Sequence, residues 1–313
     1  MKAVVLDAQD RFRLTEVEEP APGPGEVAVR VAYAGVQWGD VLVRDGHFAV
    51  PRPFVPGFEA AGRVVAVGEG VDSARVGEEV LALTSSGAYA EVVVAPAALA
   101  TAAGGLDLRT AAALGWTAPA AYDLVATAGR VRPGESVLVH AAAGGVGTLA
   151  VQFARLAGAA RVVGVAGDAD RTAYAKGFGY DEVLLRADLP ELDEEFDVIL
   201  DPVGGPVRQA GLDRLAPHGR LVAYGNLASY EPVTASANDL LMRGTSLVTY
   251  NGNLLAATHP ERLAASVREA IRAVAESRVR VDVTAEYDLA DVETAVHRLA
   301  DGTSRGKTVV RVP

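Results

Sequence analysis

The feature that most constrains the fold is a glycine-rich turn between an apolar segment and an amphipathic one. The stretch HAAAGGVGTLAVQFARLAGA covers residues 140–159 and continues the apolar run SVLVH. A strand, a tight glycine turn and a helix in this order are typical of the first βα unit of a doubly wound sheet. In the fingerprint G-x-G-x-x-G, Gly144 and Gly147 occupy the second and third positions, and Ala142 occupies the first. The turn therefore predicts a dinucleotide site with one departure from the fingerprint.

The residues of this turn have separate physical roles. Gly144 lets a pyrophosphate group approach the backbone, and Gly147 lets the helix pack closely on the strand. An anion would accept hydrogen bonds from the amides of Gly145, Val146 and Gly147. Ala142 fits the first position if the turn needs no positive φ there. A tight chain reversal without a ligand would use the same glycines, so the motif alone leaves both interpretations open.

The rest of the chain shows two patterns. From residue 136 to 251, short apolar segments alternate with amphipathic ones, which predicts a parallel, doubly wound sheet with right-handed crossovers. The stretch TSLVTYN at 245–251 is the last strand of that series, and a helix with one apolar face follows it. The first hundred residues are rich in turn-forming glycine and proline and predict strands and turns. A chain of 313 residues is expected to form two domains.

The end of the second strand distinguishes NAD from NADP. The strand RVVGVAG ends at Gly167 without the carboxylate that would bind a ribose 2′-hydroxyl, and Arg171 and Arg186 follow it. Guanidinium groups bind phosphate in bidentate geometry, so this pattern favours NADPH. Asp168 and Asp170 leave an alternative open, because either carboxylate could bind a ribose hydroxyl or pair with Arg171.

Composition argues against several other classes of protein. The formal net charge is −11, whereas proteins that bind nucleic-acid backbones present basic surface, so no nucleic-acid partner is expected. The chain has no cysteine, which excludes disulfides and thiolate metal sites. No apolar run reaches the roughly 20 residues that span a bilayer, and no signal peptide is evident. We therefore expect a soluble cytoplasmic protein without a membrane partner.

Several motifs follow one another along nearly the whole chain. They are GVQWGDVLVRDG (35–46), VPGFEAAGRVVAVGEGV (55–71), LGWTAPAAY (114–122), VLVHAAAGGVGTLAVQFARLAGA (137–159), FDVILDPVGG (196–205) and SRGKTVVRVP (304–313). Together they resemble the quinone oxidoreductase (zeta-crystallin-like) branch of the zinc-independent medium-chain dehydrogenase/reductase superfamily. In that branch alanine commonly stands where this chain has Ala142.

The resemblance implies a fold, a cofactor and an assembly. The fold is α/β, with a Rossmann doubly wound parallel sheet at 116–252 and a GroES-like β-barrel catalytic domain formed by 1–115 and 253–313. The active-site cleft would lie between the two domains, and NADPH would bind to the Rossmann domain. Arg171 and Arg186 align with positions that contact the 2′-phosphate in relatives. Relatives dimerise by pairing Rossmann edge strands, here TSLVTYN, so a homodimer is expected.

Zinc-dependent relatives use a Gly-His-Glu motif and cysteines as catalytic ligands. Here the motif is Gly57-Phe58-Glu59 and cysteine is absent, so no metal site is expected. Without a Lewis acid to polarise an alcohol or a carbonyl, metal-free hydride transfer to an activated double bond is the better fit. The resemblance thus implies an NADPH-dependent reductase of quinones or α,β-unsaturated carbonyl compounds. The alternatives are an enone or enoyl reductase dedicated to one biosynthetic pathway, and a non-catalytic NADPH-binding protein.

The catalytic candidates are Gln37, Trp38 and His47. Gln37 would hydrogen-bond the nicotinamide amide or the substrate carbonyl, or it only stabilises its loop. Trp38 would form an aromatic wall of the cleft, or it packs in the core, and His47 would contact substrate or relay a proton. Relatives usually have Asn in place of Gln37 and often Tyr in place of Leu42, so substrate specificity cannot be transferred to this chain. Phe48 stands where some relatives carry a tyrosine proton donor, and it cannot donate one.

Further cofactor candidates lie outside the glycine turn. By family position Thr117 would contact the carboxamide or the phosphates. Gly225 and Asn226 in YGN, and Asn251 in YNGN, follow strands, where cofactor contacts gather. Lys307 in RGKTVV would approach the cofactor, or it is an exposed lysine at a strand start. The predicted cofactor set is Gln37, Thr117, Ala142, Gly144, Gly145, Val146, Gly147, Gly167, Arg171, Arg186, Gly225, Asn226, Asn251 and Lys307.

No general acid can be named from the sequence. His140 is expected to pack at the strand end before the turn, and Asp201 to cap the loop that follows its strand. Tyr250 lies on the expected interface strand, where a structural role is favoured. If the product is a hydroquinone or an enolate, solvent would supply the proton.

Overall fold

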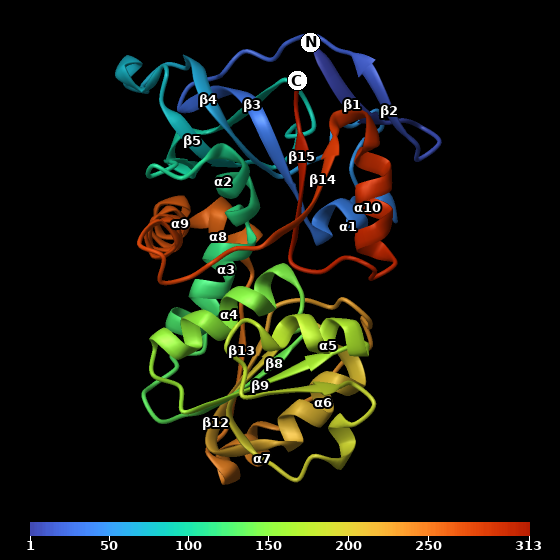
Figure 1. Cartoon of the computed structure of the whole chain (residues 1–313), viewed down its shortest axis with the longest axis vertical. Coiled ribbons are helices and arrows are strands. Elements are labelled where there is room, and N and C mark those ends of the chain that lie inside the picture. The colour runs from blue at the N-terminus through green and yellow to red at the C-terminus, as the bar shows by residue number, and fades with distance from the viewer. The chain divides into compact units, whose positions relative to one another are not determined.

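The computed structural model describes all 313 residues, which form two compact units. The first unit comprises Met1–Pro119 and Asn253–Pro313, and the second comprises Ala120–Gly252. Figure 1 colours the chain from its N-terminus to its C-terminus, so that the first unit is recognised by its blue and red segments. The boundary after Pro119 lies within helix α3 (Thr117–Asp123), slightly beyond the boundary at 115 that the sequence suggested.

The second unit is built on a six-stranded parallel sheet. Its strand order is β10-β9-β8-β11-β12-β13. Counted along the chain from β8, this order is 3-2-1-4-5-6, which is the order of the Rossmann fold. The prediction of a Rossmann sheet is therefore confirmed. Its strands are β8 (Ser136–His140), β9 (Arg161–Ala166), β10 (Glu182–Leu185), β11 (Phe196–Asp201), β12 (Leu215–Ala223) and β13 (Ser246–Thr249).

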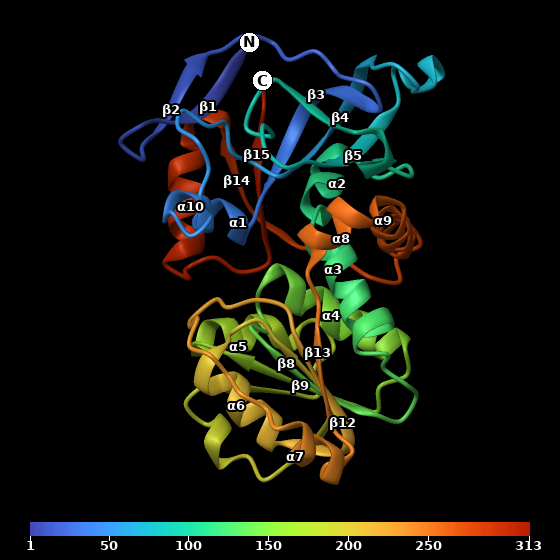
Figure 2. The ribbon, with the colours of Figure 1, turned by 180° about the vertical axis from the view of Figure 1, so that it is seen from behind.

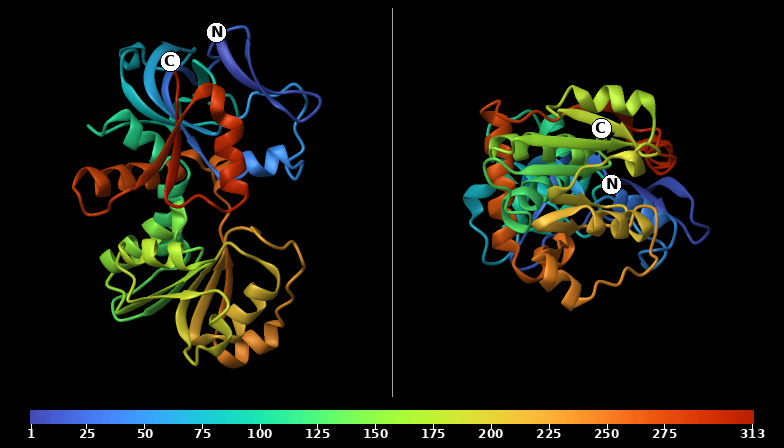
Figure 3. Two further views of the ribbon diagram at one scale, coloured as in Figure 1. Left: turned by 45° about the vertical axis from the view of Figure 1, so that its right-hand side comes forward. Right: turned by 90° about the horizontal axis from the view of Figure 1, so that it is seen from below.

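Helices connect these strands. They are α4 (Gly145–Leu156), α5 (Ala169–Lys176), α6 (Gly205–Asp213) and α7 (Ala237–Arg243). The chain moves from β8 to one edge through α4 and α5, and then from β11 to the other edge through α6 and α7. Right-handed crossovers in opposite directions place α4 and α5 on one face and α6 on the other (Figure 3). Because both faces are covered, strands such as SVLVH are almost wholly apolar and buried.

The first unit contains a seven-stranded sheet and a separate hairpin. The sheet runs β14-β15-β3-β4-β5-β7, with β6 also paired to β3, and β1 pairs with β2. Figure 2 shows β14, β15, β3, β4 and β5 side by side in this order. The fold is the GroES-like one that the resemblance implied. Its strands are β1 (Lys2–Leu6), β2 (Phe12–Glu16), β3 (Glu26–Val36), β4 (Glu59–Val67), β5 (Glu79–Leu83), β6 (Val92–Pro96), β7 (Ala100–Ala102), β14 (Val283–Asp288) and β15 (Lys307–Arg311).

The helices of the first unit include two that carry long apolar faces. These are α9 (Pro260–Ala275) and α10 (Val292–Ala300), and the shorter helices are α1 (Trp38–Arg44), α2 (Leu108–Leu114) and α8 (Gly252–Thr258). In α9 the predicted face is present, since Leu263, Val267 and Ile271 are buried. No helix in the structure is both long enough and apolar enough to cross a membrane.

Helix α1 corrects the expectation that the first hundred residues form only strands and turns. Its N-terminus is a capping box: the Gln37 side chain accepts from the Gly39 amide at 3.2 Å, and Asp40 Oδ2 accepts from the Gln37 amide at 2.9 Å. These two bonds satisfy amides that the first helical turn leaves without partners. The side-chain amide oxygen of Gln37 is therefore used to cap the helix.

The carboxyl group of Asp40 is fully buried beneath this cap. Oδ2 accepts a second bond from the Tyr89 hydroxyl at 2.8 Å, whereas Oδ1 has no hydrogen-bond partner. Burial, with a smaller contribution from the Glu59 carboxylate, raises the Asp40 pKa to about 7, although Lys307 and the two hydrogen bonds act in the opposite direction. Asp40 is thus a buried acid that retains its proton well above the usual pH for a carboxyl group.

A buried ion pair joins the two chain segments of the first unit. Lys307 Nζ on β15 donates to Glu59 Oε1 on β4 at 2.7 Å and to the Val36 carbonyl at 3.1 Å. The Lys307 side chain is 3% exposed and that of Glu59 is fully buried, so the alternative of an exposed lysine is wrong. Glu59 Oε2 accepts a further bond from the Trp116 amide at 2.5 Å.

Two glycines make room for this carboxylate. A Cβ atom on Gly35 would lie 2.1 Å from Glu59 Oε1, and one on Gly115 would lie 1.9 Å from Glu59 Oε2. Neither position can carry a larger residue without moving the carboxylate. Through the Glu59 carboxylate, the ion pair therefore links β4 to β15, and the Trp116 amide links β4 to the segment before α3.

Removing the lysine from this pair should be strongly destabilising. In Lys307→Met the Glu59 charge stays buried without its cation, so we expect the free energy of unfolding to fall by about 3–5 kcal/mol. The control is Arg311→Met on the same strand, where the ion pair with Asp288 is exposed and should contribute at most about 1 kcal/mol. Urea unfolding of both variants measures the difference, and equal losses would contradict a special role for the buried pair.

The Asp40 carboxyl group should make stability depend on pH. Because its folded pKa is about 7 and its ordinary value is 3.8, the stabilisation from the protonated group is complete below about pH 4 and is lost as pH rises through 7. The wild type should lose up to about 4 kcal/mol of unfolding free energy over this range relative to Asp40→Asn. Urea unfolding at pH 4.5 to 8 measures the two curves, with the exposed Asp45→Asn as the control. Parallel curves for wild type and Asp40→Asn would rule out this titration.

Candidate functional site

The predicted nucleotide turn lies at the carboxyl edge of the Rossmann sheet. Strands β9 and β11 flank β8, and the direction of the chain crossovers reverses there. Ligands of doubly wound sheets bind at such a reversal. The left-handed residue of the turn is Ala141, with φ of 54°, and Ala142 is not among the residues with positive φ. Ala142 is buried and its amide donates to the Val165 carbonyl at 3.0 Å, so alanine is accommodated at the first fingerprint position.

The N-terminus of α4 has the features of an anion site. Gly144 is its N-cap residue, with φ of −79°, and no side chain caps the helix. The amides of Gly145, Val146 and Gly147 belong to the first turn, where helix geometry supplies no intrahelical acceptor. A Cβ atom on Gly147 would lie 2.4 Å from the Ala141 carbonyl oxygen, so only glycine permits this close turn.

Two arginines converge beside the end of β9. A Cβ atom on Gly167 would lie 3.4 Å from Arg171 Nη1 and 3.8 Å from Arg186 Nη2. Arg171 Nε lies 3.5 Å from Asp168 Oδ2, and Asp168 also caps α5 by accepting from the Arg171 amide at 2.8 Å. Arg186 is exposed and forms no ion pair. The strand end therefore presents two guanidinium groups against one half-exposed carboxylate.

A buried histidine and a buried aspartate end the two central strands. His140 ends β8 and is 2% exposed, while Asp201 ends β11 and is fully buried. Burial, together with the charge of Arg186, lowers the His140 pKa to about 4 despite the opposing effect of Asp201, so the imidazole is neutral at pH 7. Asp201 Oδ1 accepts from the Val203 amide at 2.7 Å, as the prediction of a loop cap required.

Arg208 also contributes to this edge, and it was not predicted from the sequence. Arg208 of α6 donates hydrogen bonds to Asp201, to the Gly225 carbonyl and to the Asn226 side chain. It thereby holds two predicted cofactor residues in place. No pattern in the sequence indicates this, because α6 is separated from the loop after β12 by a whole strand. Asn251, the remaining candidate in this unit, follows β13.

The other predicted site residues lie in the first unit. Gln37 caps α1, and Trp38 is partly buried against the hydrophobic core, as its packing alternative stated. His47 is exposed in the segment that follows α1. Thr117 Oγ1 donates to the carbonyls of Ala113 and Leu114 at 3.3 and 3.2 Å. The Lys307 ammonium donates to Glu59 and to the Val36 carbonyl, which uses two of its three N–H donors, and its side chain is only 3% exposed.

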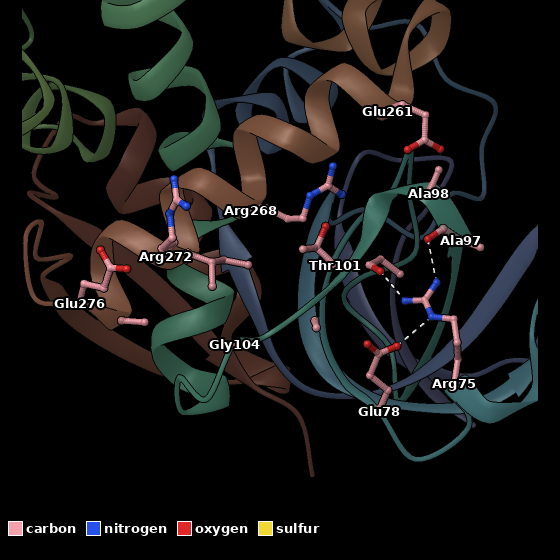
Figure 4. A pocket seen from close by; sticks show the side chains of 14 residues that line it. Arg75, Glu78, Ala97, Ala98, Thr101, Gly104, Glu261, Arg268, Arg272 and Glu276 are labelled. Carbon is pink, nitrogen blue, oxygen red and sulfur yellow. Dashed lines mark hydrogen bonds and ion pairs between the residues drawn. The ribbon is translucent and has the colours of Figure 1, made fainter. Parts of the chain in front are cut away.

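A cavity of about 590 Å³ lies elsewhere in the first unit, between α9 and the segment 75–104 (Figure 4). Arg75 in its wall donates to Glu78 and to the carbonyls of Ala97 and Ala100. The other labelled arginines come from α9, and Arg272 there pairs with Glu269. None of the predicted site residues lines this cavity. We therefore place the candidate cofactor site at the carboxyl edge of the Rossmann sheet and not in this cavity.

The residues present do not fit a zinc site. Phe58 occupies the centre of the Gly57-Phe58-Glu59 motif, and Glu59 is bound by Lys307 and Trp116. The structure brings together no group of three His, Cys, Asp or Glu side chains that could hold a metal ion. Zinc in proteins is held by three or four such ligands.

Comparison with known families supports the same architecture. Residues 23–104 match the alcohol dehydrogenase GroES-like domain, and residues 145–275 match the zinc-binding dehydrogenase family. The first match falls in the GroES-like unit and the second covers most of the Rossmann unit. The description of the second family names zinc, whereas the structure brings together no group of three potential zinc ligands.

Solved structures and curated proteins give further likenesses. A quinone oxidoreductase of Pseudomonas syringae pv. Tomato DC3000 is 30% identical, with a TM-score of 0.86 over 99% of each chain. A mycobacterial protein complexed with NADPH is 29% identical, with a TM-score of 0.88 over 99% of each chain. A mycocerosic acid synthase-like polyketide synthase of Mycolicibacterium smegmatis is 29% identical over 100% of this chain and 15% of its own length.

The curated relatives are longer than this chain, which spans about half of the length of some and 15% of others. The solved structures, in contrast, match it from end to end, and they share both units with it. The motif order, the Rossmann strand order and these full-length likenesses agree. The chain belongs to the medium-chain dehydrogenase/reductase superfamily, in its quinone oxidoreductase branch.

Proposed function

We propose that this protein is a zinc-independent, NADPH-dependent reductase of quinones or α,β-unsaturated carbonyl compounds, acting in the cytoplasm. The observation that carries the proposal is the pair of guanidinium groups beside Gly167, next to the uncapped N-terminus of α4. The two guanidinium groups would bind a 2′-phosphate, and the N-terminus of α4 would bind a pyrophosphate. The mycobacterial relative complexed with NADPH and the quinone oxidoreductase relative support the same cofactor and acceptor class.

The chain would hold the dinucleotide through groups of complementary charge. First-turn amides of α4 would bind the pyrophosphate, and Arg171 and Arg186 would bind the 2′-phosphate through charge-assisted bonds. The neutral His140 imidazole adds no charge at the strand edge. When bound, NADPH supplies the hydride for the reduction. Gln37 would orient a carbonyl group, since its amide nitrogen is not used in the cap of α1.

The proton for the reduction is assigned to solvent. Tyr89 donates to Asp40 and Tyr250 donates to Asp123 at 3.1 Å. Burial and the adjacent carboxylate raise the pKa of each tyrosine above its ordinary value. Both hydroxyl groups are therefore poor proton donors. A hydroquinone or enolate product exposed to water can be protonated without them.

We also propose that the protein is a homodimer through the Rossmann edge strand. β13 is the edge of the sheet, and an uncovered edge offers unpaired backbone groups to a second chain. On the preceding helix α7, Leu241 is 76% exposed and Met242 is 84% exposed. A second copy pairing at β13 would cover apolar surface of this kind. Light scattering should then give twice the chain mass of 32.4 kDa.

Turnover with defined acceptors tests the function. NADPH oxidation should be measured by absorbance with 1,4-benzoquinone, 9,10-phenanthrenequinone and a short enone. The proposal expects turnover with at least one acceptor class. High selectivity for one enone with little quinone turnover would favour the dedicated enone or enoyl reductase, an alternative that the polyketide synthase relative supports. NADPH binding without turnover of any acceptor would overturn the reductase and favour the non-catalytic alternative.

The two arginines should determine the preference for NADPH. Arg171→Ala and Arg186→Ala should each weaken NADPH binding by about 1–3 kcal/mol, the range for a charge-assisted hydrogen bond. NADH lacks the phosphate, so its affinity should change little. Lys176→Ala on the same helix α5 as Arg171 is the control for loss of one positive charge. If wild type binds NADH as tightly as NADPH, the alternative that Asp168 or Asp170 binds a ribose hydroxyl replaces this assignment.

A further inference from the structure

One arginine holds the loop that follows β12. Arg208 donates from Nε to Asp201 Oδ2 at 2.6 Å, from Nη1 to Asn226 Oδ1 at 3.1 Å and from Nη2 to the Gly225 carbonyl at 2.5 Å. Its side chain is 15% exposed. A single guanidinium thus joins the end of β11 to the loop after β12, and all three of its acceptors lie at the carboxyl edge of the sheet.

The chemistry of arginine fixes the orientation of the Asn226 amide. A guanidinium group has donors and no acceptor. The Asn226 atom that faces Arg208 must therefore be the oxygen. The amide nitrogen is left with two donor hydrogens, and it has no hydrogen-bond partner within the chain. Asn226 is half-buried at the strand edge, so these donors are available to a ligand there.

The neighbouring backbone is shaped around this arrangement. Gly204 has φ of 86°, and a Cβ atom on it would lie 2.9 Å from Asn226 Oδ1. The glycine therefore leaves space for the Asn226 oxygen. Asp201 uses Oδ1 to order the Val203 amide and Oδ2 to hold Arg208. The loop after β11 and the loop after β12 are thus ordered by the same buried carboxylate.

We propose that Arg208 is a positioning residue for the cofactor: it orients Asn226 so that the amide NH₂ group donates to an acceptor oxygen of NADPH. This inference rests on the proposed function of the site. Lysine cannot replace arginine here, because a single ammonium group cannot reach three acceptors in the geometry of a planar guanidinium. A purely structural role would tie β11 to β12 without acting through Asn226.

Two substitutions separate the orientation of Asn226 from its donor group. Arg208→Lys keeps a positive charge beside Asp201 but releases the Asn226 oxygen. Asn226→Asp keeps an acceptor for Arg208 but removes the donor. Each should raise the NADPH dissociation constant by about tenfold, the effect of losing one net hydrogen bond to a charged or buried group. Asn226→Asp should do so without lowering the melting temperature, since its carboxylate still pairs with Arg208.

A double variant tests whether Arg208 acts through Asn226. Arg208→Lys combined with Asn226→Ala should bind NADPH no more weakly than Asn226→Ala alone, because the oriented group is already absent. The control is Arg214→Lys, whose guanidinium donates to the carbonyls of Leu192 and Pro190 in the same unit. Its NADPH affinity should equal that of the wild type. NADPH fluorescence titrations give the affinities, and circular dichroism gives the melting temperatures.

Steady-state kinetics provide a second readout. Arg208→Lys should raise KM for NADPH and leave kcat within about twofold, as expected when a bond is lost equally from ground and transition states. Additive losses in the double variant, or unchanged NADPH affinity in Arg208→Lys, would overturn the positioning role alone. Failure of the wild type to bind NADPH would overturn the proposed function and this inference together. If the wild type binds NADPH and the effects of Arg208→Lys and Asn226→Ala on NADPH affinity are not additive, both the proposed function and the positioning role are supported.

Discussion

The first unit depends on one buried ion pair. Glu59 and Lys307 are separated by 248 positions in the chain, yet their side chains meet in the interior and share contacts with Val36 and Trp116. An uncompensated carboxylate at this depth would destabilise the fold, so the C-terminal strand must stay in register to keep the lysine in place. Gly35 and Gly115 leave space for the Glu59 carboxylate, because a Cβ atom at either position would overlap its oxygen atoms. In this chain the Glu of the Gly-Phe-Glu motif is therefore a structural group.

In the second unit, several charged groups lie at the carboxyl edge of the Rossmann sheet, and the one that is fully buried is paired. Backbone amides at α4 and the guanidinium groups of Arg171 and Arg186 provide positive potential there. The His140 imidazole stays neutral because it is buried, so it leaves that potential unchanged. Asp201 is the one fully buried carboxylate at this edge, and Arg208 neutralises it. The resulting edge is suited to an anionic dinucleotide with a donor group, Asn226, held in a defined orientation.

Much of this architecture could be predicted from local sequence, and the remainder could not. The glycine turn, the apolar strands and the end of RVVGVAG depend on neighbouring residues, and they indicated the Rossmann sheet and the arginines beside Gly167. Helix α1 was missed because its N-cap is Gln37, which is outside the usual N-cap residues, and because Gly39 lowers helix propensity. The burial of Lys307 was undecided because its partner lies on another strand. Such long-range pairs leave no periodic pattern in a single sequence.

The insertion of one unit within the other has a consequence for how the protein is made. Ala120–Gly252 is continuous, so all of its strands are available before Asn253–Pro313 has left the ribosome. The first unit must wait, since β15 pairs with both β14 and β3 and is synthesised after the whole second unit. Until then the end of β3, at residues 33–36, lacks its neighbour β15, whereas residues 26–30 can already pair with β6. Glu59 has no lysine partner until then. The nascent chain can therefore contain a complete Rossmann sheet while the GroES-like unit is still incomplete. The unpaired strands of the GroES-like unit are the part of the chain that would need protection from aggregation.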